Sequence, residues 1–254
     1  MEFENKTVVL SGAASGMSLL LARCFVQQGG NAVMSDIDEK TLAEKVAEIN
    51  AIRPGSAIGV VCDVRDYAQV CHVCAEAVRV FGTIDLVVNF AGGAELRMLS
   101  DRYHGEDLPD IPIDIFDWSL DVNLRGQMYF DHAALKYMRD QKSGVIVNIG
   151  SVTGEEGSAS NIGYATAKSG AMYGLTKSIA EYGAPHGIRC FCVAPGPVLT
   201  REAMANMKTM LNRAAEPQEV VDFILYIASE KGAFFTGNSF LMDGGRMLMV
   251  NKVW

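Results

Sequence analysis

A tyrosine and a lysine four residues apart, Tyr164 and Lys168, form the pair in this sequence best suited to proton transfer. The run around them, residues 162–182, has helical spacing, which would place both side chains on one face, one turn apart. A free tyrosine titrates near pKa ~10, which is too high for a base at neutral pH. A nearby ammonium group favours the phenolate and lowers that pKa, so the pair can act as a general acid or base.

Ser151 adds a hydroxyl thirteen positions before Tyr164. It ends the apolar run 144–151, which is predicted to be a buried strand. A hydroxyl at a strand end, followed by a glycine-containing loop, is well placed to meet a substrate oxygen. A tyrosine and lysine at this spacing are common on exposed helix faces, and it is the addition of Ser151 and of a glycine-rich turn near the N-terminus that favours a catalytic interpretation.

Seven short apolar runs, rich in β-branched residues, alternate with longer segments of helical spacing. These runs are residues 6–12, 31–36, 56–64, 84–92, 144–151, 188–196 and 239–245. Strands that are apolar on both faces and separated by helices predict a parallel sheet covered on both sides. We therefore predict one α/β domain over residues 1–254, with a doubly wound, seven-stranded parallel sheet.

The composition is that of an ordinary globular domain, with 49% hydrophobic and 20% charged residues among 254. The net charge of −8 opposes nucleic acid or an anionic membrane as a partner. No signal peptide or membrane span is recognisable, so we expect a cytoplasmic protein. The six cysteines are expected to be reduced thiols, and no metal is expected at the pair Cys71 and Cys74, because no second ligand pair accompanies it.

The glycine-rich turn, residues 11–18, lies between the first predicted strand and the first predicted helix. Gly12 and Gly16 allow a tight turn and a close approach of the backbone to a pyrophosphate, and a helix N-terminus supplies N–H groups for it. Ser18 stands where a third glycine would let helix and strand pack closely. We expect Ser18 to hold the helix slightly away, so that glycine there would bind the cofactor more tightly; contact of its hydroxyl with the cofactor is the alternative.

Asp36 ends the second predicted strand, about twenty residues past this turn. An acid there can accept hydrogen bonds from an adenosine ribose and would repel a 2′-phosphate. No Arg or Lys lies in the turn or directly after Asp36, where Ile37 stands. The sequence therefore predicts NAD rather than NADP. The alternative, that Asp36 caps the next helix, is disfavoured because Asp38 can serve as that cap.

Together these motifs resemble the short-chain dehydrogenase/reductase family. Its catalytic Ser, Tyr and Lys match Ser151, Tyr164 and Lys168, and its fourth active-site residue matches Asn123. The resemblance spans nearly the whole chain and implies a Rossmann-like fold. It also implies that Asn123 disturbs its helix locally and holds a water linked to the lysine; an Asn in mid-helix that faces solvent is the alternative.

The resemblance extends the cofactor site beyond the first turn. Asp63 matches an acid that meets the adenine, residues 89–92 match the family's N-N-A-G with Phe90 as a departure, and Val198 and Thr200 match positions near the carboxamide and ribose. The expected cofactor-binding residues are Ser11, Gly12, Ser15, Gly16, Met17, Asp36, Ile37, Asp63, Val64, Asn89, Ala91, Gly92, Tyr164, Lys168, Pro195, Gly196, Val198 and Thr200.

Two segments are candidates for shaping the substrate site. Residues 97–112 form an apparent insertion after the 84–92 strand, which either borders the substrate or contacts another subunit. Residues 200–216 are rich in methionine at helical spacing and are predicted to form a lid with a pliable apolar wall. The apolar C-terminal stretch after Arg246 suggests a subunit interface, and we expect a homotetramer.

These features predict an NAD-dependent oxidoreductase that interconverts a secondary alcohol and a ketone. A carrier-bound substrate would favour basic residues around the entrance, whereas this chain is acidic, and Asp131 lies on the helix of Asn123. Glu155, Glu156 and the polar residues in 97–107 offer hydrogen-bond partners for several hydroxyl groups. We therefore expect a polyol or a sugar, with a 3-oxoacyl thioester or a hydroxysteroid as the alternative. The alternative from another class is a non-catalytic NAD-binding regulator, which the intact Ser–Tyr–Lys set opposes.

Overall fold

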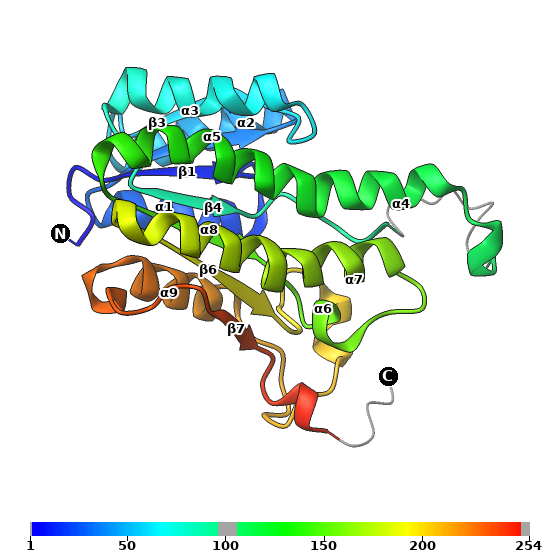
Figure 1. Ribbon diagram of the computed structural model, residues 1–254. Helices are drawn as coiled ribbons and strands as arrows, with labels where there is room; N and C mark the ends of the chain where they lie inside the picture. Colours follow the sequence, from blue (N-terminus) through cyan, green and yellow to red (C-terminus); the bar gives the residue numbers. More distant parts are fainter. Residues whose placement is uncertain (1, 96–105, 250–254) are drawn as a thin grey trace.

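The structure, a computed structural model, describes residues 2–95 and 106–249 (Figure 1). Seven parallel strands form one sheet in the order β3-β2-β1-β4-β5-β6-β7. The strands are β1 (Thr7–Ser11), β2 (Asn31–Asp36), β3 (Ala57–Val61), β4 (Leu86–Asn89), β5 (Gly144–Ile149), β6 (Ile188–Pro195) and β7 (Ser239–Met242). Each lies within one of the seven apolar runs, so the predicted doubly wound α/β fold is confirmed.

Helices cover both faces of the sheet, as the alternation of side chains along each strand requires. On β1, Val8 and Leu10 face a core formed with helices α1 (Gly16–Gln27), α2 (Glu39–Ile52) and α9 (Pro217–Ala228). Val9 faces the other core, formed with α3 (Tyr67–Phe81), α5 (Gly126–Gln141) and α8 (Thr176–Gly183). Both cores are closed by fully buried aliphatic and aromatic side chains. Among the described residues, no helix is long and apolar enough to cross a membrane.

Two long helical rods carry the residues of chemical interest and run side by side (Figure 1). The first joins α4 (Ile113–Leu120) to α5 through a π-helical turn, Asp121–Arg125. The second joins α7 (Ile162–Ser169) to α8 through another π-helical turn, Gly170–Leu175. A short helix, α6 (Thr153–Glu156), lies between β5 and α7. π turns insert an extra residue and are frequent at functional sites.

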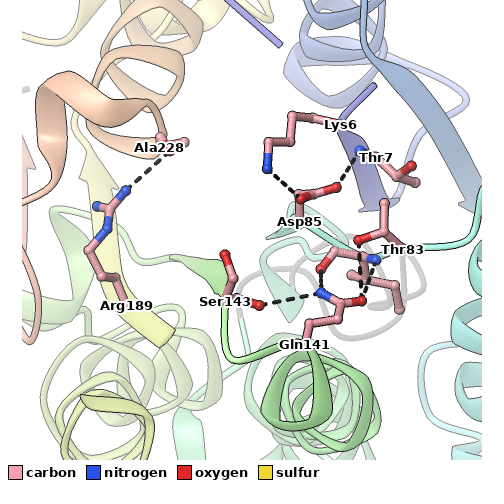
Figure 2. Close-up of polar contacts among 9 residues, drawn as sticks. Lys6, Thr7, Thr83, Asp85, Gln141, Ser143, Arg189 and Ala228 are labelled. Carbon is pink, nitrogen blue, oxygen red and sulfur yellow. Dashed lines mark hydrogen bonds and ion pairs between the residues drawn. The ribbon is translucent and has the colours of Figure 1, made fainter. Parts of the chain in front are cut away.

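The N-terminal ends of the strands lie away from these features and are fixed by polar contacts (Figure 2). The Asp85 carboxylate accepts hydrogen bonds from Lys6 Nζ and from the Thr7 backbone N–H, both at 2.9 Å. The Gln141 side chain accepts from the Ile84 backbone N–H at 3.1 Å and donates to the Ile84 carbonyl at 2.9 Å and to the Ser143 carbonyl at 3.3 Å. These bonds join the start of β1 and the end of α5 to the residues that precede β4.

Arg189 fixes the end of α9 in the same region. Its guanidinium donates to the backbone carbonyl of Ala228 at 3.2 Å (Figure 2). It also donates to the carbonyls of Ile227 at 2.8 Å, Gly232 at 3.0 Å and Ser229 at 3.2 Å. The last carbonyls of a helix have no partner within it. One side chain of β6 therefore supplies the donors that this helix end lacks.

Residues 200–216, whose methionines have helical spacing, do not form a continuous helix. Residues 200–216 contain a single short 3-10 helix, Glu202–Asn206, followed by irregular chain. Met210 and Leu211 are 57% and 66% exposed, so no continuous apolar stripe is buried there, and Asn212 adopts a left-handed conformation. A short helix without a buried face is not stable in water. Of the predicted insertion, residues 97–105 lie outside the described residues; residues 106–112 contain the 3-10 helix Leu108–Asp110, which is exposed.

Candidate active site

The carboxyl ends of the strands open into a groove of about 660 Å³ that continues into a cavity of about 400 Å³. Met17, Phe90, Gly92, Thr200 and Arg201 line both, so the two are contiguous. This is the edge of an open parallel sheet at which ligands bind.

The glycine-rich turn forms one wall of the groove. Gly12 and Gly16 have φ of 62° and 60°, in the left-handed region that favours glycine. A Cβ on Gly12 would lie 3.0 Å from the Cα of Ala91, so the turn also needs glycine for space. Helix α1 begins at Gly16, and its N-cap, Ser15, makes no side-chain capping bond, which leaves first-turn N–H groups to face the groove. An anion such as a pyrophosphate fits this end of the groove.

Ser18 does not act as expected from the sequence. Its side chain is buried, and its hydroxyl donates to the Ser11 carbonyl at 3.0 Å, so it ties helix α1 to the end of β1 rather than holding the two apart. The Ser11 hydroxyl accepts from the Ala91 backbone N–H at 3.0 Å. Ser11, predicted to bind the cofactor, lines neither cavity and instead links the ends of β1 and β4.

Replacing Ser18 by glycine is expected to lower the free energy of unfolding by about 1 to 2 kcal/mol, because a buried hydrogen bond is lost and glycine disfavours a helix. Cofactor binding, measured by calorimetry, should weaken because the turn is less firmly held. Urea unfolding checks the stability, with Ser15→Gly as the control, since Ser15 makes no capping bond. Tighter binding by Ser18→Gly would restore the spacer interpretation.

Asp36 lies at the far end of the groove, where β2 ends. Its Oδ2 accepts from the Ala14 N–H at 3.0 Å and its Oδ1 from the Asp38 N–H at 3.1 Å, which fixes the carboxylate at the groove. Asp38 caps α2 through Thr41, as predicted. Ile37 also lines the groove and is 65% exposed.

Asp63 and Val64 line the groove beside β3. The Arg65 guanidinium binds the Asp63 carboxylate, with Nη2 to Oδ2 at 2.6 Å, and this ion pair lowers the pKa of Asp63. Sequence reasoning missed Arg65, although an acid and a base two residues apart at a strand end were a visible signal. Trp118 and Val122 were also missed; they lie four residues apart on the rod that leads to Asn123 and complete the groove wall.

The cavity brings together the residues of the predicted catalytic set. Ser151, Tyr164 and Lys168 all line it, as do Pro195, Gly196 and Val198. Lys168 is 2% exposed, its Nζ donates to the Ile149 carbonyl at 2.8 Å, and it lies 5.6 Å from the centre of the Tyr164 ring. Burial lowers the pKa of Lys168 to about 8. Below that pH the ammonium is charged, and an ammonium so close to the ring favours the phenolate of Tyr164.

Asn123 sits in the π-helical turn, so the expected local disturbance of its helix is present. Its side chain is buried and lines neither cavity. It clamps the loop after β4: Nδ2 donates to the Gly93 carbonyl at 2.9 Å, and Oδ1 accepts from the Gly93 N–H at 3.0 Å. A Cβ on Gly92 would lie 2.5 Å from Asn123 Oδ1 and 3.4 Å from Lys168 Nζ. Gly92 itself lines both the groove and the cavity, so these two polar groups lie directly behind it.

Asn89, predicted to bind the cofactor, does not reach either cavity. Its side chain points into the core, where its Nδ2 donates to Asp131 at 2.7 Å and to Asn148 at 2.9 Å. Asp131 is fully buried in this network and therefore adds no acidic charge to the cavity entrance, contrary to the argument from sequence. Adjacent positions on a strand face opposite ways, and the sequence motif does not say which way each one faces.

The groove fits a dinucleotide. The Asp36 carboxylate and the glycine-rich turn lie toward one end of the groove, together with apolar walls. Small residues line the other end, where the groove meets the cavity with Ser151, Tyr164 and Lys168. A turn of this kind next to an acid–base set defines a nucleotide-dependent oxidoreductase of the α/β class. A family model described as enoyl-(acyl carrier protein) reductase matches residues 12–246. The chain belongs to the short-chain dehydrogenase/reductase family, and it is an oxidoreductase that acts on CH–OH groups with a nicotinamide cofactor.

Relatives with different stated activities resemble the chain to a similar degree. A 3-oxoacyl-(acyl-carrier-protein) reductase of Thermotoga maritima is 33% identical, covering 98% of this chain and 100% of the relative. A 7alpha-hydroxysteroid dehydrogenase of Bacteroides fragilis is 30% identical, covering 96% and 95%. A solved Brucella melitensis structure, titled a glucose/ribitol dehydrogenase, superposes with a TM-score of 0.83 at 27% identity, covering 96% and 98%. A 3-oxoacyl-(acyl-carrier-protein) reductase with bound NAD from the same organism gives 0.85 at 28%, covering 96% and 92%.

Proposed function

We propose that the protein oxidises a secondary alcohol of a polyol or sugar with NAD, or reduces the corresponding ketone with NADH. The observation that carries the proposal is the convergence of Ser151, Tyr164 and Lys168 on one cavity that opens into a dinucleotide-sized groove. The same convergence opposes a non-catalytic NAD-binding regulator, which has no need of an acid–base set in a substrate-sized space.

In the oxidation, Tyr164 takes the proton of the substrate hydroxyl while Ser151 donates a hydrogen bond to the same oxygen. Lys168 keeps Tyr164 ionisable, because its buried ammonium favours the phenolate. Asn123 holds the loop after β4 in place behind Gly92. The nicotinamide cofactor, when bound, supplies the acceptor or donor of the hydride.

The polar character of the cavity supports a substrate with several hydroxyl groups. Besides the catalytic set, its wall carries Thr153, Glu156, Ser158, Ser160 and Asn161. The Glu156 carboxylate is fixed there by Arg246, which is 2% exposed and donates from Nε at 2.9 Å. A site built from hydrogen-bonding groups rejects analogues that lack hydroxyls, because its own polar groups would be left unpaired.

A 3-oxoacyl thioester or a hydroxysteroid is the second candidate substrate. It is favoured by the stated activities of two relatives and by the apolar side of the cavity, where Met204, Met207 and Phe90 lie. The two candidates differ in what the distal part of the substrate offers to Glu156, namely hydroxyl donors or hydrocarbon.

Turnover measured through NADH absorbance tests the proposal directly. The purified protein is assayed with a panel of sugar alcohols, sugars, hydroxysteroids and 3-oxoacyl thioesters, in both directions. We expect the highest kcat/KM for a polyol or sugar. A preference for a thioester or steroid would replace the substrate assignment, and no turnover with any member of the panel, despite NAD binding, would favour the regulator.

NAD is proposed as the preferred cofactor because the fixed Asp36 carboxylate lines the groove and Ile37, which follows it, offers no positive charge. We expect Asp36→Ala combined with Ile37→Arg to shift the NADP/NAD ratio of kcat/KM upward by about 10² or more, since a repulsion is removed and a phosphate partner added. The ratio is measured with saturating substrate. A wild type that already prefers NADPH would show that Asp36 does not set the preference.

We further propose that residues 200–216 form a lid over the substrate, that the protein is a homotetramer, and that it is cytoplasmic. Met204 and Met207 of the segment line the cavity.

Three exposed apolar side chains suit a subunit contact: Leu248 and Phe234, exposed by 77% and 103%, and Leu241 on the outermost strand. All six cysteines are free thiols, which suits a reducing compartment. Light scattering after a sizing column tests the tetramer.

A further inference from the structure

We propose that Glu95 is a positioning residue for the reaction, holding the catalytic helix so that Tyr164 meets the substrate; this rests on the proposed function. Glu95 follows β4 and is 2% exposed. Its Oε1 accepts from the Gly163 backbone N–H at 2.7 Å, and its Oε2 accepts from the Tyr164 backbone N–H at 2.6 Å. One buried carboxylate therefore grips the main chain of the residue that transfers the proton.

The start of α7 has a particular need for such a partner. The first N–H groups of a helix lack acceptors within it, and the N-cap residue of α7, Asn161, makes no side-chain capping bond. Glu95 supplies acceptors for two of these N–H groups, from a position 68 residues before Gly163 in the chain. Hydrogen bonds to a carboxylate are short and strong, and a negative charge is favourable at a helix N-terminus.

Glu95 bears on the Tyr164–Lys168 pair because the helix is held at both of these residues. Glu95 holds the backbone at Tyr164, and one turn later Lys168 is anchored to the Ile149 carbonyl at 2.8 Å. The fit is tight at Gly163, where an added Cβ would lie 3.0 Å from the Ser119 side chain and 3.1 Å from Glu95 Oε2. With both anchors in place, the phenol ring has little freedom to move relative to the ammonium.

Glu95 also relates the catalytic helix to the cofactor groove. The loop that carries it includes Gly92, which lines both groove and cavity, and Gly93, whose backbone is hydrogen-bonded to Asn123. The wall against which the cofactor would lie and the helix that carries Tyr164 are therefore joined through one side chain. A misplacement of about 1 Å between reacting groups can cost about 10²-fold in rate, so this link bears on turnover.

A helix cap with a purely structural role is the competing interpretation, and the chain offers a matched control. Asp66 caps α3 with its side chain: its Oδ1 accepts from the backbone N–H groups of Ala68 and Gln69, and its Oδ2 accepts from Gln69 Nε2. Neither Asp66 nor α3 contributes to the lining of the groove or the cavity. Glu95→Gln and Asp66→Asn make the same chemical change at the start of two helices. The amide retains one acceptor oxygen, whereas its NH₂ group is a donor facing another donor, so each variant loses one of its hydrogen bonds.

The experiment compares Glu95→Gln and Glu95→Ala with Asp66→Asn. We expect kcat to fall tenfold or more in the Glu95 variants, with a larger solvent deuterium isotope effect because proton transfer becomes slower. NAD affinity, measured by fluorescence, should stay within twofold of wild type. Asp66→Asn should show a lower Tm with kcat within twofold of wild type. Hydrogen–deuterium exchange should become faster across residues 162–168 in both Glu95 variants and stay unchanged there in Asp66→Asn.

A Glu95→Gln protein with kcat within twofold of wild type would overturn the proposal, as would an equal loss of kcat in Asp66→Asn. A wild type without turnover on any alcohol would instead overturn the proposed function. In that case unchanged exchange across residues 162–168 in Glu95→Gln overturns the role of Glu95 as the anchor of this helix, and faster exchange there supports it.

Discussion

Replacing Tyr164 by phenylalanine is expected to lower kcat by about 10³-fold or more, because the group that exchanges the substrate proton is removed while the ring remains. NAD binding should stay close to wild type, since the groove from Gly12 to Thr200 does not depend on the hydroxyl. NADH absorbance measures turnover, and fluorescence titration measures cofactor binding. A Phe variant with turnover comparable to wild type would show that another group transfers the proton.

The chain contains its own control for this experiment. Tyr173 and Lys177 repeat the spacing of Tyr164 and Lys168 on the same helical rod, and Lys177 Nζ lies 5.3 Å from the Tyr173 ring centre. Tyr173 is 39% exposed and lines neither the groove nor the cavity. Tyr173→Phe should therefore leave kcat unchanged. A matching loss in both variants would indicate that damage to the rod, rather than loss of an acid–base group, explains the effect.

The second large effect concerns stability and originates at Asp131. This carboxylate is fully buried and accepts hydrogen bonds from Asn89 at 2.7 Å and Asn148 at 3.1 Å. Burial raises its pKa to about 7, although the two hydrogen bonds act in the opposite direction. In the unfolded chain an aspartate titrates near ~3.9. Between these values the folded state binds more protons, so its stability falls as the pH rises.

The contribution of Asp131 is therefore fully present below about pH 4 and lost above about pH 7. Between pH 5 and pH 8 we expect the free energy of unfolding to fall by about 2 to 3 kcal/mol from this group. Asp131→Asn removes the titration and should remove that slope in urea unfolding. Asp140→Asn, on the same helix with its side chain 69% exposed, should retain it. Equal slopes in wild type and Asp131→Asn would mean that Asp131 stays ionised in the folded protein.

The sheet was predictable because each strand is apolar on both faces, a pattern that parallel strands under two helical layers impose. Residues 200–216 do not form the helix that the spacing of their methionines suggests: Met204 and Met207 line the cavity, whereas Met210 is 57% exposed. Spacing alone treats a stripe that faces solvent and one that faces a core in the same way.

The site was partly predictable for a related reason. Ser151, Tyr164 and Lys168 lie within eighteen residues of one another, so local spacing brings them together. Glu95 meets Tyr164 only through the tertiary fold, across 69 residues, and no local pattern announces it. Asn89 and Asp131 were misplaced because a polar residue at a strand end or on a helix can face either the ligand edge or the core.

The π turn at Asp121–Arg125 has a consequence for how this protein can vary in length. An α-helix advances by about 100° per residue, so one inserted residue rotates everything before it relative to everything after it by about that angle. α4 packs against α7, and α5 packs against α3 and the sheet. Without the extra residue the two halves would be out of phase: with α5 seated on the sheet, Trp118 would turn away from the groove wall. The number of residues between Trp118 and Phe130 is therefore fixed by angular register, even though the rod looks continuous.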